Sequence, residues 1–346
     1  MPFRNLNRRG KILVSGAALL LALLIAEAGL RLSSSDPLSF HPARLRHITR
    51  LESVYPYAYH ERLGWATVPG KSVNGQSIDA RGLRGNGFSS NVRGGSILVL
   101  GDSFVYGDEV GDAETWPAHL ERILGRTVLN GGVCGYGLDQ IVLRGEELIP
   151  RLKPALVLVS IIPEDIRRCR LLCRYGAKPC FDIIEQDQLL LKNLPVPYSF
   201  FHRPRQLAWD LAGTSFLVDE VLLRIAPEWW RGKHYIREAH QREKELVTPL
   251  LRKLKQTVEA HGGKMAFILA AAKPPIQKAG YMPLALESAR SLGLPTLDMA
   301  GQLLEILDRE PEKANQWFAP GGHMTGAGNK WFAEQVGVFL VNLGDI

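Results

Sequence analysis

Residues 97–107 read I-L-V-L-G-D-S-F-V-Y-G and place a serine directly after a run of apolar residues. Residues 96–100 have the length and aliphatic composition of a strand that is buried on both faces. Gly101 permits a tight turn, and the residues after Ser103 can open a helix. A hydroxyl there would lie at the carboxyl end of a parallel strand, where open α/β sheets bind ligands. An ordinary turn uses the same residue types, so this stretch alone leaves both interpretations open.

Similar apolar runs recur along the chain and alternate with helical patterns. The predicted strands are residues 96–100, the start of 127–137, 154–162, 264–271 and 296–298, and the predicted helices are 114–124, 138–152, 239–261 and 329–340. Strands that alternate with helices indicate a parallel, doubly wound α/β sheet. Residues 167–235 interrupt the alternation, and we predict that they form an insertion that flanks the site. Its tryptophans, Trp209, Trp229 and Trp230, either stack on sugar rings or form a small satellite core.

The first residues have the pattern of a targeting segment. Four basic residues, Arg4, Arg8, Arg9 and Lys11, precede an apolar run. This charge bias predicts a cytoplasmic tail over residues 1–11, a transmembrane signal anchor over 12–31 and a tether over 32–60. The outer domain would then cover residues 61–346. Residues 26–28, Ala-Glu-Ala, also fit a signal-peptidase site, so a cleaved leader is the alternative to a retained anchor.

Composition excludes some functions and leaves others open. The chain of 346 residues is 46% hydrophobic and carries a net charge of +7. Because no basic stripe interleaved with aromatic residues is present, we expect no nucleic-acid partner. Arg167, Arg168 and Arg170 form the densest basic cluster, which is either a solvated face or a contact for an anionic substrate.

The four cysteines, Cys134, Cys169, Cys173 and Cys180, fit an oxidising compartment only weakly. Three pairings are possible, and a bridge between Cys173 and Cys180 is the one we favour because a short loop could close it. The sequence has no Cys-x-x-Cys pair and no histidine at ligand spacing, so we predict no zinc site, no other metal and no cofactor.

Several blocks together resemble the SGNH/GDSL hydrolase superfamily in order and spacing. They are Gly-Asp-Ser at 101–103, a glycine-rich loop at 131–137, Pro-Glu-Asp at 163–165 and G-H-M-T-G-A-G at 322–328. The resemblance extends over about residues 60 to 346 and includes Glu-Thr-Trp-Pro at 114–117. It implies a three-layer α/β/α, flavodoxin-like fold. The leader at 63–65 and 82–85 looks like that of membrane-anchored bacterial members, which implies a single-pass protein of the bacterial inner membrane with a periplasmic catalytic domain.

The resemblance assigns a role to each of four residues. Ser103 would be the nucleophile and would also supply a backbone N–H to the oxyanion. Gly135 matches the loop glycine whose N–H is the second oxyanion donor, and Gln140 matches a structural glutamine of that block. His323 would be the general base that takes the Ser103 proton and returns a proton to the leaving alcohol. In the simpler alternative, the glycines at 131–137 only build a turn.

Two positions depart from the family pattern. The aspartate that orients the catalytic histidine, two residues before it, falls on Gly321, and Asp298 or Asp165 could substitute from elsewhere. Glu164 occupies the place of an asparagine that donates to the oxyanion, and an ionised glutamate cannot donate. Glu164 is therefore protonated, or points away, or leaves only two donors; it could also orient His323. Asp102, next to Ser103, is a further auxiliary candidate.

These features predict a membrane-tethered serine esterase that removes O-acyl groups, most simply O-acetyl, from an envelope or extracellular glycan through a Ser103 acyl-enzyme. An O-acyltransferase with the same site is one alternative. A catalytically degenerate SGNH domain that binds a glycan or a protein partner is the other. The sequence names no protein partner.

Overall fold

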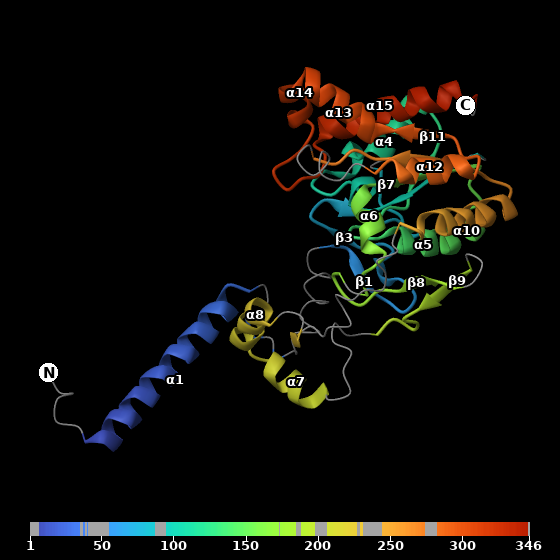
Figure 1. The fold of residues 1–346 in the computed structure, drawn as a ribbon. Helices are drawn as coiled ribbons and strands as arrows, with labels where there is room; N and C mark the ends of the chain where they lie inside the picture. The colour runs from blue at the N-terminus through green and yellow to red at the C-terminus, as the bar shows by residue number, and fades with distance from the viewer. Residues whose placement is uncertain are drawn as a thin grey trace. The chain divides into compact units, whose positions relative to one another are not determined.

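The computed structural model describes residues 7–34, 37–38, 40, 55–86, 95–172, 174–184, 188–197, 206–226, 229–230, 244–273 and 282–344. The chain divides into two compact units (Figure 1). The smaller unit combines residues 1–50 with 199–235, and the larger unit combines residues 51–198 with 236–346.

A five-stranded sheet forms the centre of the larger unit, and its strands are all parallel. The strands are β5 (Ile97–Gly101), β6 (Val128–Asn130), β7 (Leu156–Ile161), β10 (Lys264–Leu269) and β11 (Thr296–Asp298). Their order across the sheet is β11-β10-β7-β5-β6. In chain order this is the flavodoxin-like arrangement, whose switch point lies between the first and third strands, here β5 and β7. The predicted fold class is confirmed.

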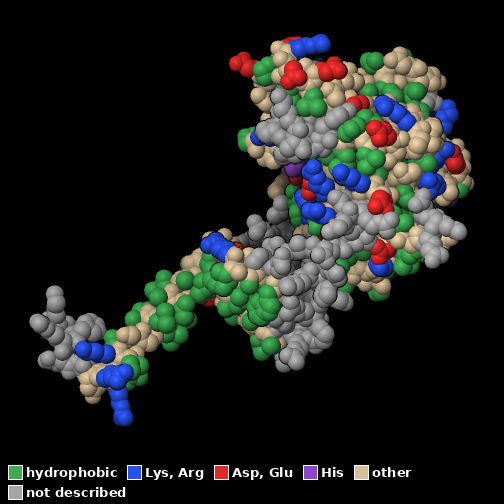
Figure 2. Space-filling model, in the orientation of Figure 1, with side chains coloured by type: hydrophobic (Ala, Val, Ile, Leu, Met, Phe, Trp, Pro, Cys, Tyr) green, Lys and Arg blue, Asp and Glu red, His purple; other side chains and the backbone are tan. Residues whose placement is uncertain are grey.

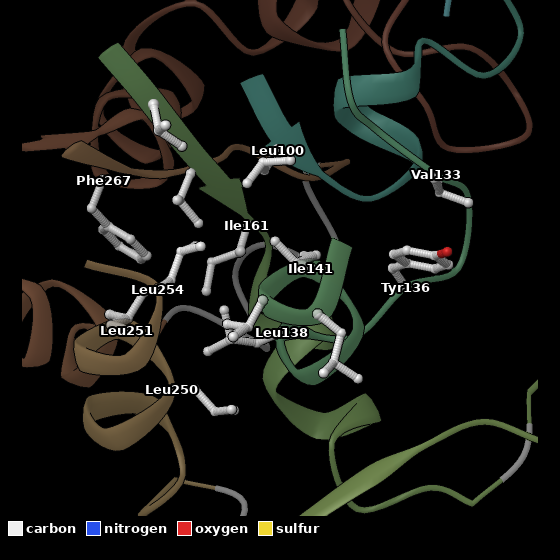
Figure 3. Close-up of a cluster of buried hydrophobic side chains, with 14 of the residues drawn as sticks. Leu100, Val133, Tyr136, Leu138, Ile141, Ile161, Leu250, Leu251, Leu254 and Phe267 are labelled. Carbon is white, nitrogen blue, oxygen red and sulfur yellow. The ribbon is translucent and has the colours of Figure 1, made fainter. Parts of the chain in front are cut away.

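Helices cover both faces of this sheet. One face carries α5 (Leu138–Leu152), α10 (Val247–Ala260) and α12 (Leu284–Ser291), and the other carries α4 (Trp116–Leu124), α13 (Met299–Arg309) and α15 (Gly326–Asn342). Side chains alternate along each strand, so Leu98 and Leu100 enter the first core while Ile97 and Val99 enter the second. Figure 3 shows the first core, where leucines of α10 meet Phe267 of β10 and Ile141 of α5.

Shorter elements complete the larger unit. Antiparallel pairs precede the sheet, β1 (Tyr57–His60) with β2 (Gly64–Thr67) and β3 (Ser72–Val73) with β4 (Gln76–Ser77). A third pair, β8 (Cys180–Ile183) with β9 (Leu189–Lys192), follows α6 (Pro163–Arg168). The remaining short helices are α3 (Ser103–Tyr106), η2 (Asp112–Glu114) and α14 (Pro311–Gln316).

The predicted helix over 239–261 begins later than expected, at Val247. Residues 231–243 lie outside the described part of the chain. An apolar stripe along this helix is buried: Leu246, Leu250, Leu254 and Val258 are at most 1% exposed. Pro249 lies in the first turn of α10, where its missing N–H removes no helical hydrogen bond.

The smaller unit contains α1 (Arg8–Leu32), α7 (Gln206–Gly213) and α8 (Phe216–Ile225). In α1, 25 residues long, no residue is buried. By length and composition α1 could cross a membrane, and a signal sequence would meet the same criteria. The helix spans the predicted anchor and includes Arg8, Arg9 and Lys11 before it, while Arg4 lies outside the described residues.

Candidate active site

Ser103 begins α3 immediately after β5, at the switch point of the sheet. A Cβ on Gly101 would overlap the Ser160 carbonyl of the neighbouring strand, so only glycine permits this turn. Asp102 caps α3 by accepting a hydrogen bond of 2.9 Å from Phe104 N–H. Ser103 is thus held at the carboxyl edge of the sheet, 6% exposed, with its N–H at the open end of the helix.

His323 comes from the other end of the chain and reaches Ser103. Its Nε2 atom lies 2.9 Å from Ser103 Oγ. The turn that presents it is closed by Ala319 N–H donating to the His323 carbonyl at 2.8 Å. Thr325 then caps α15, and the ring of Phe104 lies 5.3 Å from the imidazole, centroid to centroid.

The carboxylate beside His323 belongs to Glu109, a residue outside the sequence blocks that resemble the SGNH/GDSL superfamily. Its Oε1 lies 3.3 Å from His323 Nδ1. A Cβ built on Gly321 would overlap that same Glu109 oxygen. The family's aspartate position is therefore occupied by a carboxylate that arrives from the loop after α3. The histidine tautomer that satisfies both contacts carries its proton on Nδ1, donates to Glu109 and accepts from Ser103.

Asp108 supports this arrangement from the next position. Its Oδ2 lies 3.9 Å from His323 Nδ1 and accepts a hydrogen bond of 2.9 Å from Tyr55 Oη. The backbone of Glu109 has φ +70°, in the left-handed region that residues other than glycine rarely adopt. Strain of this kind is concentrated at functional sites, where the surrounding fold enforces it.

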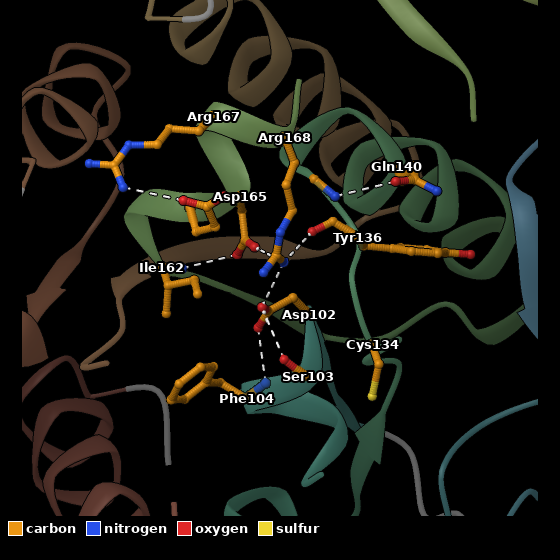
Figure 4. Close-up of polar contacts among 12 residues, drawn as sticks. Asp102, Ser103, Phe104, Cys134, Tyr136, Gln140, Ile162, Asp165, Arg167 and Arg168 are labelled. Carbon is orange, nitrogen blue, oxygen red and sulfur yellow. Dashed lines mark hydrogen bonds and ion pairs between the residues drawn. The ribbon is translucent and has the colours of Figure 1, made fainter. Parts of the chain in front are cut away.

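A buried ionic cluster lies beneath Ser103 (Figure 4). Arg168 Nη1 donates to Asp102 Oδ2 at 3.0 Å, to Asp165 Oδ1 at 2.6 Å and to the Tyr136 carbonyl at 2.9 Å. Ser103 Oγ is 3.3 Å from Asp102 Oδ2, a longer contact than its 2.9 Å contact with His323. The hydroxyl has one proton, so it can donate to only one of these two acceptors at a time.

Burial raises the pKa of Asp165 well above its ordinary value, and the nearby carboxylate of Asp102 raises it further. The guanidinium of Arg168 opposes this rise, since it donates to both carboxyl groups. Of the predicted basic cluster, Arg168 is therefore neither a solvated face nor a contact for substrate: it is 4% exposed and structural.

The glycine-rich loop brings a second backbone donor to the site. Gly135 has φ +79°, and a Cβ there would overlap the Tyr175 ring. In the described part of the chain no acceptor is found for its N–H. The β1–β2 pair holds the loop: Trp65 Nε1 donates to the Cys134 carbonyl at 3.0 Å, and Cys134 N–H donates to Tyr57 Oη at 2.9 Å.

Gln140 lies in the first turn of α5 and fastens the same pair of strands to this loop. Its Nε2 donates to the Leu63 carbonyl at 2.7 Å, and its Oε1 accepts from Gly137 N–H at 3.3 Å. This is a structural arrangement, as the resemblance implies for the glutamine.

Glu164 points away from the site. Its Oε2 pairs with Arg167 Nη1 at 3.2 Å, and both side chains are more than a third exposed. The suggestion that Glu164 orients His323 is therefore wrong, because Glu109 and Asp108 are the carboxylates that the structure brings to the imidazole.

A different residue, Arg174, lies against the glycine-rich loop. Its Nε is buried without a hydrogen-bond partner in the described residues and lies 3.1 Å from the position a Gly135 Cβ would take. Unpartnered buried donors of this kind are uncommon in folded proteins.

Two other predicted features have structural roles or fail. Asp298 accepts from Gly301 N–H at 2.8 Å and caps α13, two strands beyond β7 in the sheet. The predicted disulfide between Cys173 and Cys180 is wrong, because Cys180 of β8 is a free, buried thiol. Cys173 itself lies outside the described residues. Within the described ranges, no group of three or more His, Cys, Asp or Glu side chains could hold a metal ion.

No protein-family model matches the chain, and no curated protein matches it. The structure is similar to that of a protein described as lipolytic and of the G-D-S-L family from Desulfitobacterium hafniense, with TM-score 0.42 and 12% identity over 71% of this chain and 99% of the other. It is also similar to a lipase/acylhydrolase from Enterococcus faecalis, with TM-score 0.42 and 11% identity over 71% and 95%. An acetylxylan esterase from Geobacillus stearothermophilus gives TM-score 0.44 and 13% identity over 72% and 96%. Similarity at these identities is one of fold alone.

Proposed function

We propose that this chain is a membrane-tethered serine esterase of the SGNH type that works through a Ser103 acyl-enzyme. The observation that carries the proposal is the linked set Ser103, His323 and Glu109, with contacts of 2.9 and 3.3 Å. A nucleophile, a base and a group that orients the base are the parts that acyl transfer from an ester requires. The departures from the family pattern at Gly321 and Glu164 favour the alternative of a degenerate site. The first no longer does so, because Glu109 supplies a carboxylate next to His323.

In the proposed acylation step, Ser103, His323 and Glu109 act together. His323 Nε2 takes the proton as Ser103 Oγ attacks the ester carbonyl, and the carboxylate of Glu109 stabilises the imidazolium that forms. Collapse of the tetrahedral intermediate breaks the bond to the alcohol, which leaves with the proton from His323. Water then attacks the acyl-enzyme with the same base, releasing the carboxylic acid and restoring Ser103.

The negative charge on the tetrahedral oxygen requires donors. Ser103 N–H and Gly135 N–H would supply two. We assign the third to Arg174, since its buried Nε lacks a partner and lies beside Gly135. A guanidinium is always charged and donates strongly, so it would compensate for the missing asparagine at Glu164.

The substrate class we propose is an O-acyl group, most simply O-acetyl, on an envelope or extracellular glycan. It rests on the sequence resemblance to membrane-anchored bacterial hydrolases, and the apolar α1 supports a tether. With the amino terminus in the cytoplasm, the larger unit would lie in the periplasm. An O-acyltransferase would use the same acyl-enzyme and differ only in the acceptor.

A fluorophosphonate probe applied to the full-length protein in detergent tests the proposal. We expect covalent labelling in the wild type, loss of labelling in Ser103→Ala and retention in Ser72→Ala, an exposed serine of β3. Folded wild-type protein that takes up no probe would overturn the enzyme and favour a binding module. Where labelling occurs, acetate release from an acetylated glycan, measured with and without a second glycan acceptor, separates esterase from transferase.

A further inference from the structure

The smaller unit joins the end of the apolar α1 helix to α8 through charged groups. Glu27 Oε2 accepts from Ser215 Oγ and from Leu217 N–H, both at 2.8 Å, and its Oε1 accepts from Phe216 N–H at 3.1 Å. A carboxylate thus caps the amino end of the 10-residue helix α8, where the helix dipole favours negative charge.

Arg31, one turn further along α1, completes the connection. Its Nε pairs with Glu27 Oε1 at 2.7 Å, and its Nη2 donates to the Thr214 carbonyl at 2.8 Å. The guanidinium also lies over the Phe216 ring, 4.8 Å from the centroid. Glu27 and Arg31 at the end of α1 therefore both bind α8 or the two residues before it, Thr214 and Ser215. These contacts hold the two helices together.

The position of this contact along α1 determines how deep α8 would lie relative to a membrane that α1 crosses. The apolar run of α1 ends at Ala26, and the helix itself ends at Leu32. At 1.5 Å per residue, these points are separated by about 9 Å, comparable to the headgroup layer on one side of a bilayer. If α1 crosses a membrane, the start of α8 lies in that layer.

The same unit exposes large apolar side chains that its own small core does not cover. Val221 and Ile225, one turn apart on α8, are 43% and 72% exposed, Leu211 of α7 is 64% exposed, and Trp229 is 51% exposed. By contrast, Trp230 is buried and its Nε1 donates to Asp219 Oδ1 at 2.8 Å. Figure 2 shows hydrophobic side chains along α1 and over α8.

We propose that these exposed residues of α7 and α8, together with Trp229, lie in the lipid surface of the membrane that α1 crosses. Helices with one apolar face lie in the interface plane with that face among the acyl chains, and tryptophan is enriched at this depth. The inference rests on α1 as a membrane span but not on the esterase chemistry. Trp230 and Asp219 give the unit its satellite core, while the exposed residues bind lipid rather than sugar.

The test uses the full-length protein, with Cys173→Ser, in dilute vesicles of phosphatidylethanolamine and phosphatidylglycerol. An environment-sensitive nitrobenzoxadiazole label is placed at Ile225→Cys and, as a matched control, at Glu220→Cys on another side of α8. The other cysteines are buried and free. We expect blue-shifted emission at position 225, quenching by nitroxide-labelled headgroups and several-fold weaker quenching by aqueous iodide than at position 220.

Equal emission and equal iodide quenching at the two positions would overturn the inference. So would a blue shift at position 225 that appears only at high protein density, because a second copy of the chain would then cover the helix. Resistance to extraction from membranes by alkaline carbonate reports on α1 separately. Neither result depends on probe labelling of Ser103, so failure here is distinguishable from failure of the esterase proposal.

Discussion

Exchanging the carboxylate between positions 109 and 321 gives the sharpest test of the site. We predict that Glu109→Ala and Gly321→Asp each impair ester hydrolysis and that the double variant recovers part of the loss. Glu109→Ala removes the charge next to His323. Gly321→Asp places a side chain where Glu109 Oε1 already lies, so it displaces that oxygen. With both changes, an aspartate at 321 can occupy the space that Glu109 leaves.

The magnitude follows from the contact between Glu109 Oε1 and His323 Nδ1. Two unit charges 3.3 Å apart interact by roughly 2.5 to 5 kcal/mol when the effective dielectric constant is about 40 to 20. Both side chains are partly exposed, at 32% and 23%, and Asp108 remains 3.9 Å away, so the lower end applies. A loss of about 2.5 kcal/mol in transition-state stabilisation lowers kcat by about 10²-fold.

The assay is hydrolysis of p-nitrophenyl acetate by the full-length protein in detergent, with thermal unfolding to show that each variant is folded. Glu109→Gln keeps the shape and loses the charge, and we expect most of the same loss. Glu312→Ala, which removes an exposed carboxylate of α14, is the matched control. The reasoning fails if Glu109→Ala stays within a few-fold of wild type, or if the double variant is no faster than either single one.

Four further outcomes follow from the structure. Arg174→Ala should lower kcat about 10² to 10³-fold with little change in KM, as for loss of one oxyanion donor, while Arg167→Ala changes neither; equal effects would remove Arg174 from the site. Gly135→Ala should reduce the free energy of unfolding by about 1–3 kcal/mol, seen in thermal melts, because an L-residue there has positive φ and overlaps Tyr175. Burial raises the pKa of Cys180 to about 11, so its alkylation by iodoacetamide at pH 8 should be at least about 100-fold slower than that of an ordinary thiol and should accelerate with pH; rapid reaction of the folded protein would contradict this. Because the pKa of Asp165 is raised in the folded state, its contribution to stability is full below its unfolded pKa and is lost as pH rises through its folded pKa; Asp165→Asn should flatten the decline in melting temperature between those two pKa values.

The sheet could be predicted from the sequence because its strands are buried on both faces. Continuous apolar runs such as residues 97–100 and 156–159 are typical of strands in the middle of a parallel sheet, and glycine, proline and polar residues mark their ends. The order of the strands does not follow from these runs alone. It came from the resemblance, which placed Ser103 and His323 together across 220 positions.

Glu109 could not be found in the same way. Its role depends on the left-handed backbone conformation of Glu109 and on the absence of a side chain at Gly321, which leaves room for the Glu109 carboxylate. Neither feature can be recognised from the sequence. A useful signal was present all the same: the absence of a carboxylate at 321 implied that another should be sought near His323. The candidates Glu164 and Asp165 follow β7, and Asp298 ends β11. Glu109 instead follows the nucleophile itself.

This origin of Glu109 changes which parts of the molecule must be aligned for chemistry. When the acid lies two residues before the histidine, both groups come from one loop, and that loop must be positioned correctly against the serine. Here the serine and the acid share one short segment, residues 103–109, so the chain itself limits how far apart they can lie. A single long-range event, the seating of the His323 turn, would then complete the site. Loop exchanges around residues 319–325 could therefore vary substrate access while leaving two of the three reacting groups undisturbed.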